Sequence, residues 1–269
     1  MAVALAEVVA LLEELAPLRF AEPWDNVGLL IDPPLPDGEI QRALLTIDLT
    51  HAVLEEAVAG ACELVIAYHP PIFKPLSRLT RAAAPVALAA VRAGIAVYSP
   101  HTAADAAVGG VNDWLADALG AGGREPLMAA SVPEAAPGTG MGRRIALATA
   151  FGLEEAVRRV KEHLGLAHVR VAASERHARG VAIQSVAVCA GAGGAVFERI
   201  SGVDLYVTGE MRHHDVLAKV AAGSSVILCD HTNTERGYLR RLAAELHRRS
   251  ASRLDVSVSE RDADPLSVS

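Results

Sequence analysis

Two pairs of side chains that could bind a metal ion stand four residues apart in this chain. His231 and Glu235 follow one apolar run, and His101 and Asp105 repeat the interval after another. If the chain turns into a helix after the first run, this spacing places an imidazole and a carboxylate on one face, one turn apart. Taken singly, each pair is also typical of a helix cap or of a solvated surface.

A third histidine, His69, follows the apolar run 64–67 and precedes Pro70 and Pro71. The prolines forbid a helix there and hold the backbone extended, which fixes the direction of the imidazole. Three apolar strands would thus deliver histidines at their carboxyl ends, the edge where ligands bind in an open α/β sheet. We interpret this pattern as one metal site, although a histidine in a surface loop would explain His69 alone.

Further polar residues follow another predicted strand, 203–207. Glu210, His213 and His214 bring three ionisable side chains together after this strand. They could orient metal ligands or transfer protons, and Glu210 is the candidate general acid or base.

A glycine-rich turn, Gly191 to Gly194, follows the predicted strand 186–190. Its backbone N–H groups could hold an anion, yet it satisfies neither nucleotide-binding motif. A tight turn required for packing explains it equally well. Asp25 and Asn26, in the turn after Trp24, could also approach a site, but turn formation accounts for them.

The elements that position these residues alternate between strand and helix, which favours an α/β fold. Composition shifts at residues 120–142, rich in glycine, proline, alanine and serine, and we place a domain boundary there. The predicted first domain comprises residues 1–124 with 236–269, and the second comprises 125–235. The last predicted strand, 254–259, returns to the sheet of the first domain.

Several smaller interpretations concern single residues. Asp48 or Thr50 is expected to cap a helix that starts near His51, and Asn112 to cap a helix that reaches residue 119. Three histidines without partners at ligand spacing are interpreted as solvated: His163, His168 and His177.

Composition limits the partners and the location. The chain has 269 residues, 51% of them hydrophobic, and a net charge of -7, so a nucleic-acid partner is not expected. The arginine-rich segment 236–249 is typical of a solvated helix face. The three cysteines, Cys62, Cys189 and Cys229, lie in apolar runs without C-x-x-C spacing and should be buried, reduced thiols. No signal peptide or membrane span is recognisable, which predicts a soluble, cytoplasmic protein.

The order of motifs resembles a known family. W-D-N-V-G-L-L, Y-H-P-P-I-F, S-P-H-T-A-A-D, G-A-G-G, T-G-E-M-R-H-H-D and H-T-N-T-E-R-G occur in the order found in the family named for the yeast NGG-one-interacting factor. Its bacterial members are often called GTP cyclohydrolase I type 2 homologues. The resemblance spans residues 5–266 and implies two similar α/β domains with a dinuclear metal site in the cleft between them, in a homohexamer. It implies these metal ligands: His69, Asp105, His231 and Glu235, with His101 beside them or among them.

One position departs from the common bacterial pattern. Many bacterial members carry two adjacent histidines where this chain has Tyr68 and His69. The tyrosine form resembles the eukaryotic branch and raises the question of whether both metal positions are filled. Tyr68, His213 or His214 could compensate. The chain is also too short for the extra central domain of longer members, so it is the compact form.

These features favour a hydrolase that uses two divalent metal ions, and the family name implies GTP ring opening. The donor types suit zinc, manganese, iron or nickel. A metal-dependent phosphoesterase is one alternative, with Arg236 and the turn 191–194 on phosphate. A non-catalytic regulatory or scaffold protein with a protein partner is the other. The expected substrate is a small molecule, with a nucleotide as one candidate.

Overall fold

The computed structural model describes residues 2–35, 38–133 and 135–266. The chain forms two compact units, the first made of Met1–Ala104 and Leu239–Ser269 and the second of Asp105–Tyr238. Each unit contains its own mixed β-sheet with helices, as expected for two α/β domains.

The sheet of the first unit has five strands in the order β15-β4-β5-β6-β2. Four run parallel, and β2 pairs antiparallel with β6 at the edge. The pairing of β15 with β4 confirms the predicted return of the last strand. Their bounds are β2 Gly28–Ile31, β4 Arg42–Thr46, β5 Leu64–Ala67, β6 Ala96–Ser99 and β15 Asp255–Val258. Every residue of β5 and β6 is buried, as in strands covered on both faces.

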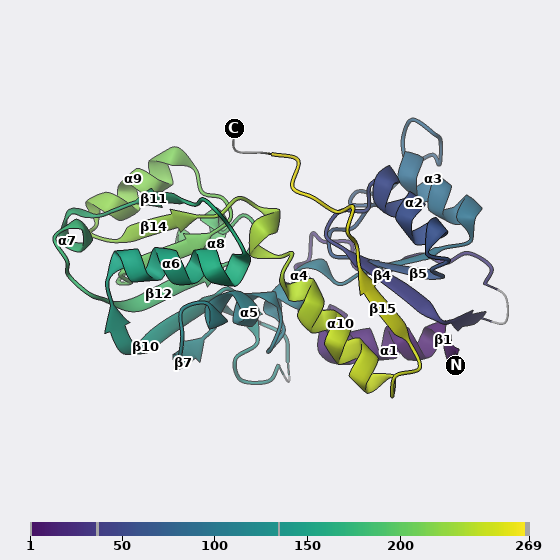
Figure 1. Ribbon diagram of the computed structural model, residues 1–269, viewed down its shortest axis with the longest axis horizontal. Helices are drawn as coiled ribbons and strands as arrows, with labels where there is room; N and C mark the ends of the chain where they lie inside the picture. Colours follow the sequence, from purple (N-terminus) through teal and green to yellow (C-terminus); the bar gives the residue numbers. More distant parts are fainter. Residues whose placement is uncertain (1, 36–37, 134, 267–269) are drawn as a thin grey trace. The chain divides into compact units, whose positions relative to one another are not determined.

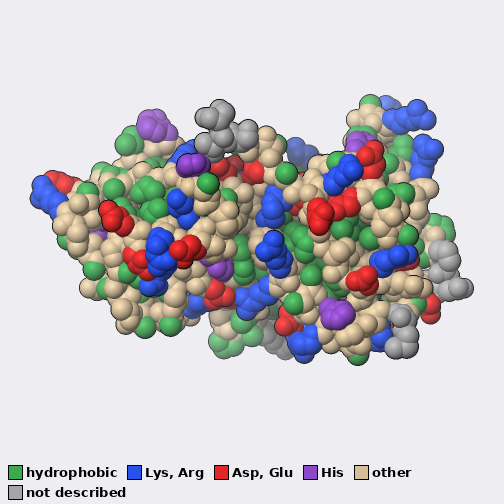
Figure 2. Space-filling view, in the orientation of Figure 1, with side chains coloured by type: hydrophobic (Ala, Val, Ile, Leu, Met, Phe, Trp, Pro, Cys, Tyr) green, Lys and Arg blue, Asp and Glu red, His purple; other side chains and the backbone are tan. Residues whose placement is uncertain are grey.

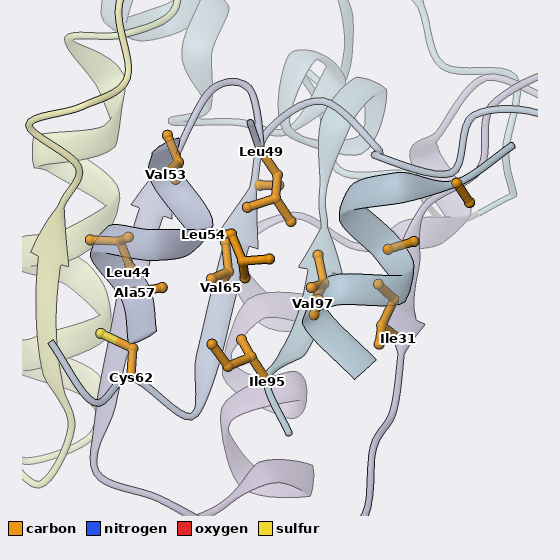
Figure 3. Close-up of a cluster of buried hydrophobic side chains, with 14 residues drawn as sticks. Ile31, Leu44, Leu49, Val53, Leu54, Ala57, Cys62, Val65, Ile95 and Val97 are labelled. Carbon is orange, nitrogen blue, oxygen red and sulfur yellow. The ribbon is translucent and has the colours of Figure 1, made fainter. Parts of the chain in front are cut away.

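Helices α2 (His51–Ala59) and α3 (Pro85–Ala93) pack against this sheet and enclose an apolar core (Figure 3). Leu54 from α2 belongs to this core together with Val65 and Val97 from the strands. Helix α2 begins where predicted, because the side chain of Thr50 accepts a hydrogen bond from the N–H of Val53.

Two more helices, α1 (Leu5–Leu15) and α10 (Tyr238–Arg249), lie side by side in Figure 1. The guanidinium of Arg249 donates to the carboxylate of Glu14 at 3.0 Å and joins them. The smaller elements of this unit are β1 Val3–Ala4, paired with β3 Glu39–Ile40, and the 3-10 helix η1 Leu18–Phe20. Helix α4, His101–Ala106, follows β6.

The sheet of the second unit has six strands in the order β11-β14-β13-β12-β10-β7. The central three are parallel, and antiparallel strands flank them on both sides. Their bounds are β7 Gly122–Glu125, β10 Arg143–Phe151, β11 Arg170–Ala172, β12 Ile183–Cys189, β13 Leu205–Thr208 and β14 Ser225–Leu228. A separate two-stranded pair is formed by β8 Met128–Ala129 and β9 Gly140–Met141.

Helices cover both faces of the second sheet. One core holds side chains of β12, β13 and β14 against α8 (Gly194–Phe197) and α9 (His213–Ala221). Helix α5 (Val111–Asp117) contacts β10 and β12, and α6 (Leu153–Leu164) packs beside α5, where the ring of His163 lies 4.5 Å from that of Trp114. Figure 1 shows α6 lying across this sheet. A single-turn helix, α7, spans Glu175–Ala178.

The observed division places residues 105–124 in the second unit, whereas the sequence-based boundary follows residue 124. The reason is strand pairing: β7 hydrogen-bonds to β10, and α5 contacts β10 and β12. The low-complexity stretch 120–142 therefore contains an edge strand of the second sheet.

Three interpretations of single residues were wrong. His163, which was expected to be solvated, is half-buried with its ring 4.5 Å from that of Trp114, and burial lowers its pKa. Asn112 does not cap α5, because its side chain donates to the carbonyl of Asp105 and accepts from the N–H of Ala190 instead. His177 is buried rather than solvated, and its Nδ1 meets the hydroxyls of Ser174 and Ser225. Polar partners inside the fold bind the side chain of Asn112 and the Nδ1 atom of His177, and these partners could not be inferred from local pattern.

Candidate metal centre

In the first unit, His69 stands directly after β5. Its backbone N–H donates to the carbonyl of Ile47, and its Nδ1 donates to the carboxylate of Asp48 at 3.0 Å. A carboxylate on Nδ1 fixes the tautomer and the ring orientation, so that Nε2 is the nitrogen suited to coordinate an ion. Asp48 therefore orients the imidazole of His69, and it also precedes α2 in the chain.

His101 is oriented in the same way by a residue that sequence reasoning had assigned to a turn. Its Nδ1 donates to Asp25 Oδ1 at 2.8 Å, and the other oxygen of Asp25 accepts from the N–H and hydroxyl of Thr102. Burial raises the pKa of this carboxyl, but the hydrogen bonds from His101 and Thr102 outweigh it and lower the pKa below its ordinary value. The carboxylate is thus held ionised against the imidazole.

The two imidazoles of the first unit are neighbours. Their ring centroids lie 5.4 Å apart, nearly perpendicular at 86°. Tyr68 packs edge-on against both, with centroid distances of 5.5 Å to His69 and 6.0 Å to His101. Only 1% of Tyr68 is exposed, so this residue forms a wall behind the two rings.

In the second unit, His231 and Glu235 come together as predicted, but not on an α-helix. The segment between them is a 3-10 helix, Thr232–Thr234, and it ends at Glu235. His231 Nε2 nonetheless lies 3.5 Å from Glu235 Oε1. The chain leaves β14 through Asp230, which has a left-handed conformation (φ 64°).

The glycine-rich turn after β12 makes room for this pair. A Cβ on Gly191 would lie 2.6 Å from Glu235 Oε1 and 2.9 Å from His231 Nε2. The turn is also fixed: the N–H of Gly191 donates to the Thr234 hydroxyl, and its carbonyl accepts from the N–H of Glu210. Close approach to the two candidate ligands thus explains Gly191.

Glu210 borders His231 on its other side, with Oε2 3.6 Å from Nδ1. Its side chain is 55% exposed, so it can exchange protons with solvent. His213 and His214 begin α9, are both exposed, and contact each other at a ring distance of 5.4 Å.

The negative charges of Asp105 and Glu235 both affect the pKa of one buried thiol, that of Cys189. Burial is the main cause that raises the pKa of Cys189, and the negative charges of Asp105 and Glu235 raise it further. Both carboxylates therefore lie close to the end of β12. All three cysteines are buried and free, as predicted.

Among the residues that the structure describes, His231 and Glu235 of the second unit offer an imidazole nitrogen and a carboxylate oxygen to a metal ion, and His69 of the first unit offers another imidazole nitrogen. In both units the candidate donors follow parallel strands at their carboxyl ends, the usual place for ligands in α/β sheets. These features define an α/β protein with a candidate metal centre.

Comparison with known proteins gives the family. Residues 3–265 match the family described as Duf34/NIF3 (NGG1p interacting factor 3). The chain is 44% identical to NIF3-like protein 1 of Drosophila melanogaster over 266 residues, which cover 97% of this chain and 88% of the relative. It is 40% identical to NGG1-interacting factor 3 of Saccharomyces cerevisiae over 282 residues, covering 98% and 96%. The chain belongs to the Duf34/NIF3 family.

Solved structures share the fold. A Bacillus cereus protein related to NIF3 superposes with a TM-score of 0.82 at 21% identity and covers 98% of both chains. Reduced HcgD from Methanocaldococcus jannaschii gives a TM-score of 0.80 at 23% identity, covering 97% of this chain and 99% of its own. Within the described part of this chain, no helix is both long and apolar enough to span a membrane.

Proposed function

We propose that this protein is a metal-dependent hydrolase with a dinuclear centre, whose ligands come from both units. The first unit would supply His69 and His101, and the second would supply Asp105, His231 and Glu235. The observation that carries the proposal is the paired orientation in the first unit, where two neighbouring imidazoles each have Nδ1 bonded to a carboxylate. That arrangement is typical of histidines that coordinate a metal ion.

The donor set fits divalent ions of the zinc, manganese, iron or nickel type, because it combines imidazole with carboxylate and contains no thiolate. Space at Gly191 supports the fit, since any side chain there would displace His231 and Glu235. When bound, such ions would supply Lewis-acid chemistry, polarising the bond to be cleaved and making water more acidic.

The remaining residues would position groups and move protons. Asp48 and Asp25 hold His69 and His101 in place through their Nδ1 atoms. Glu210 is the proposed general acid or base, because it combines an exposed carboxylate with a position beside His231. Its backbone is tied to Gly191, so the side chain starts from a fixed point.

The proposed reaction is hydrolytic ring opening of a purine nucleotide such as GTP, as the names of bacterial family members suggest. The phosphoesterase alternative has less support, because two N–H groups of the turn 191–194 are already bonded. Gly191 donates to Thr234 and Gly193 donates to Thr208, so neither is directed at a phosphate. A nucleic-acid partner also lacks support on the face shown in Figure 2, where basic and acidic side chains are interspersed.

A regulatory or scaffold role has one source of support, the name NGG1-interacting factor 3 carried by the yeast relative. We also propose, on the family resemblance, a cytoplasmic homohexamer. Light scattering after size-exclusion chromatography measures the assembly directly, and a monomer would contradict it.

The test is a hydrolysis assay on protein reconstituted separately with each of the four metals. GTP and a panel of phosphate esters are offered to wild type, His69→Ala and Glu210→Gln. Ring opening by wild type, lost in His69→Ala and reduced in Glu210→Gln with the metal retained, is the expected result. Cleavage of phosphate esters without ring opening of GTP would favour the phosphoesterase alternative. No turnover with any metal would refute the proposed hydrolase.

A further inference from the structure

Two large aromatic side chains stand exposed beside a candidate metal ligand in the first unit. Trp24 is 60% exposed and Phe73 is 45% exposed. Their rings lie 6.0 Å apart, tilted at 59°, and His101 lies 6.2 Å from Trp24 and 6.3 Å from Phe73. The three rings are mutual neighbours, although they come from three separate segments.

Local hydrogen bonds hold the pair in place. Asp25, next to Trp24, is fixed by His101 and Thr102. Asn26 donates from its side-chain amide to the carbonyl of Ile72, the residue before Phe73. The two aromatic loops are therefore tied to each other and to the histidine. Aromatic rings exposed on a fixed backbone cost little entropy when a ligand stacks on them.

The segment that carries Phe73 is also positively charged. Lys74, Arg78 and Arg81 follow it within eight residues, all exposed, and no acidic residue occurs between residues 70 and 84. A ligand that stacks on the aromatic pair would thus meet a basic segment if it carried an anionic group.

We propose that Trp24 and Phe73 form a stacking platform for a flat heteroaromatic ring of the substrate, with the anionic group of that substrate toward the basic segment 74–81. This inference rests on the proposed hydrolase, because it places the ring beside His101. It assigns specificity-determining residues that do not themselves bind metal. The exposed faces suit a planar ring, since Trp24 is 60% exposed even with Phe73 beside it.

The experiment uses guanosine 5′-monophosphate as the probe that carries an aromatic base and ribose 5-phosphate as the base-free control of similar charge. Calorimetric titrations are run on the full chain, both metal-free and metal-loaded. Trp24→Leu and Phe73→Leu should each weaken binding of the nucleotide by about tenfold or more, since an aromatic stacking contact contributes this much per base. Trp24→Phe keeps a ring and should lose less. Val58→Ala, which trims an equally exposed apolar side chain on α2, should bind as wild type does.

Tryptophan fluorescence locates the contact. The chain has two tryptophans, and Trp114 is only 9% exposed, so stacking on Trp24 should quench the exposed emission in wild type and not in Trp24→Leu. The base-free probe should leave the emission unchanged.

The outcomes separate this inference from the proposed function. Quenching and ring-dependent binding in metal-free protein support the platform even if no hydrolysis is ever found. Hydrolysis with equal binding of both probes and no effect of Trp24→Leu overturns the platform and leaves the hydrolase standing. Dissociation of the oligomer by Trp24→Leu, without any quenching by nucleotide, would show that the pair is a contact between copies of the chain and would also overturn it.

Discussion

Substitution of Gly191 by alanine perturbs the candidate centre without removing any ligand. The new Cβ would lie 2.6 Å from Glu235 Oε1 and 2.9 Å from His231 Nε2. Ordinary contact begins at 3.4 Å, so the carboxylate oxygen must retreat by about 0.8 Å and the imidazole nitrogen by about 0.5 Å. Metal–ligand distances tolerate only about 0.2 Å.

The backbone of the turn cannot easily absorb this clash. Thr234 and Glu210 fix Gly191 through its N–H and its carbonyl, and the Thr208 hydroxyl donates to the same carbonyl. The two candidate ligands must therefore move instead. We expect metal affinity to fall by at least 10-fold to 100-fold, the range found when groups that only orient ligands are removed.

A matched control separates this effect from backbone strain. Gly191 has φ 61°, and alanine in that conformation costs about 1 kcal/mol in either state of metal loading. Gly165, at the end of α6, has φ 69°, and a Cβ added there would meet no atom within 4 Å. Gly165→Ala should lose similar stability and keep its metal affinity.

The assay is a competition titration against a chromogenic chelator, with chemical unfolding of the metal-free proteins in parallel. Gly191→Ala should lose metal affinity while Gly165→Ala does not. Equal metal affinity in Gly191→Ala and wild type would refute the placement of a metal ion between His231 and Glu235.

Other predictions concern stability and thiol chemistry. Arg143 is the largest fully buried side chain among the described residues, and its guanidinium donates to both oxygens of Asp113 and to three backbone carbonyls. Arg143→Lys should therefore lower the free energy of unfolding by about 3 kcal/mol, measured with urea. A loss below about 1 kcal/mol would contradict this. Burial alone would raise the pKa of Asp113, but its bonds to Arg143 lower it, so its stabilising effect is complete above the ordinary value of 3.8 and is lost as pH falls through the depressed folded pKa. The stability difference between wild type and Asp113→Asn should accordingly shrink in that acid range, and a difference independent of pH would refute the assignment. Thr50→Ala should destabilise the protein by about 1 kcal/mol through loss of the α2 cap, whereas Thr50→Ser should retain most of that stability. Burial raises the pKa of all three thiols, that of Cys229 to about 12, so a thiol reagent should label none in the native protein and three after unfolding.

The features that the sequence predicted well are those encoded by local pattern. Apolar runs of four or five residues became the parallel strands, and the chain ends in a strand that pairs with β4, as expected. The same runs placed His69 and His231 just after strands, because a polar residue that follows a buried strand must leave the sheet at its edge.

Partners distant in the sequence could not be predicted in this way. Asp25 lies 76 residues from His101, and only the fold reveals that its carboxylate orients the imidazole. A turn residue flanked by Trp24 and Asn26 gives no local signal of this role. The boundary between the two units was likewise not recognisable from local pattern. Strand β7 is short, half of its residues are glycine, and its place in the second sheet follows from pairing with β10.

The conformation of the turn between His231 and Glu235 could not be predicted from local pattern either. The four-residue interval between His231 and Glu235 suits an α-helix, yet a 3-10 helix brings the same atoms together. Asp230 adopts a left-handed conformation before this turn and Gly191 lies close to both side chains, and neither feature can be read from residue spacing. Residue spacing thus predicted proximity but not conformation.

The most direct test of the central claim is the metal content of protein purified without chelator or a metal-affinity column, measured by elemental mass spectrometry. His69→Ala removes a candidate ligand from the first unit, His231→Ala removes one from the second, and His168→Ala removes an exposed histidine as the control. We predict about two ions per chain in wild type and in the control, with metal lost in both ligand variants. A wild type that holds no metal even after reloading, or ligand variants that hold as much as wild type, would contradict a metal centre built from both units.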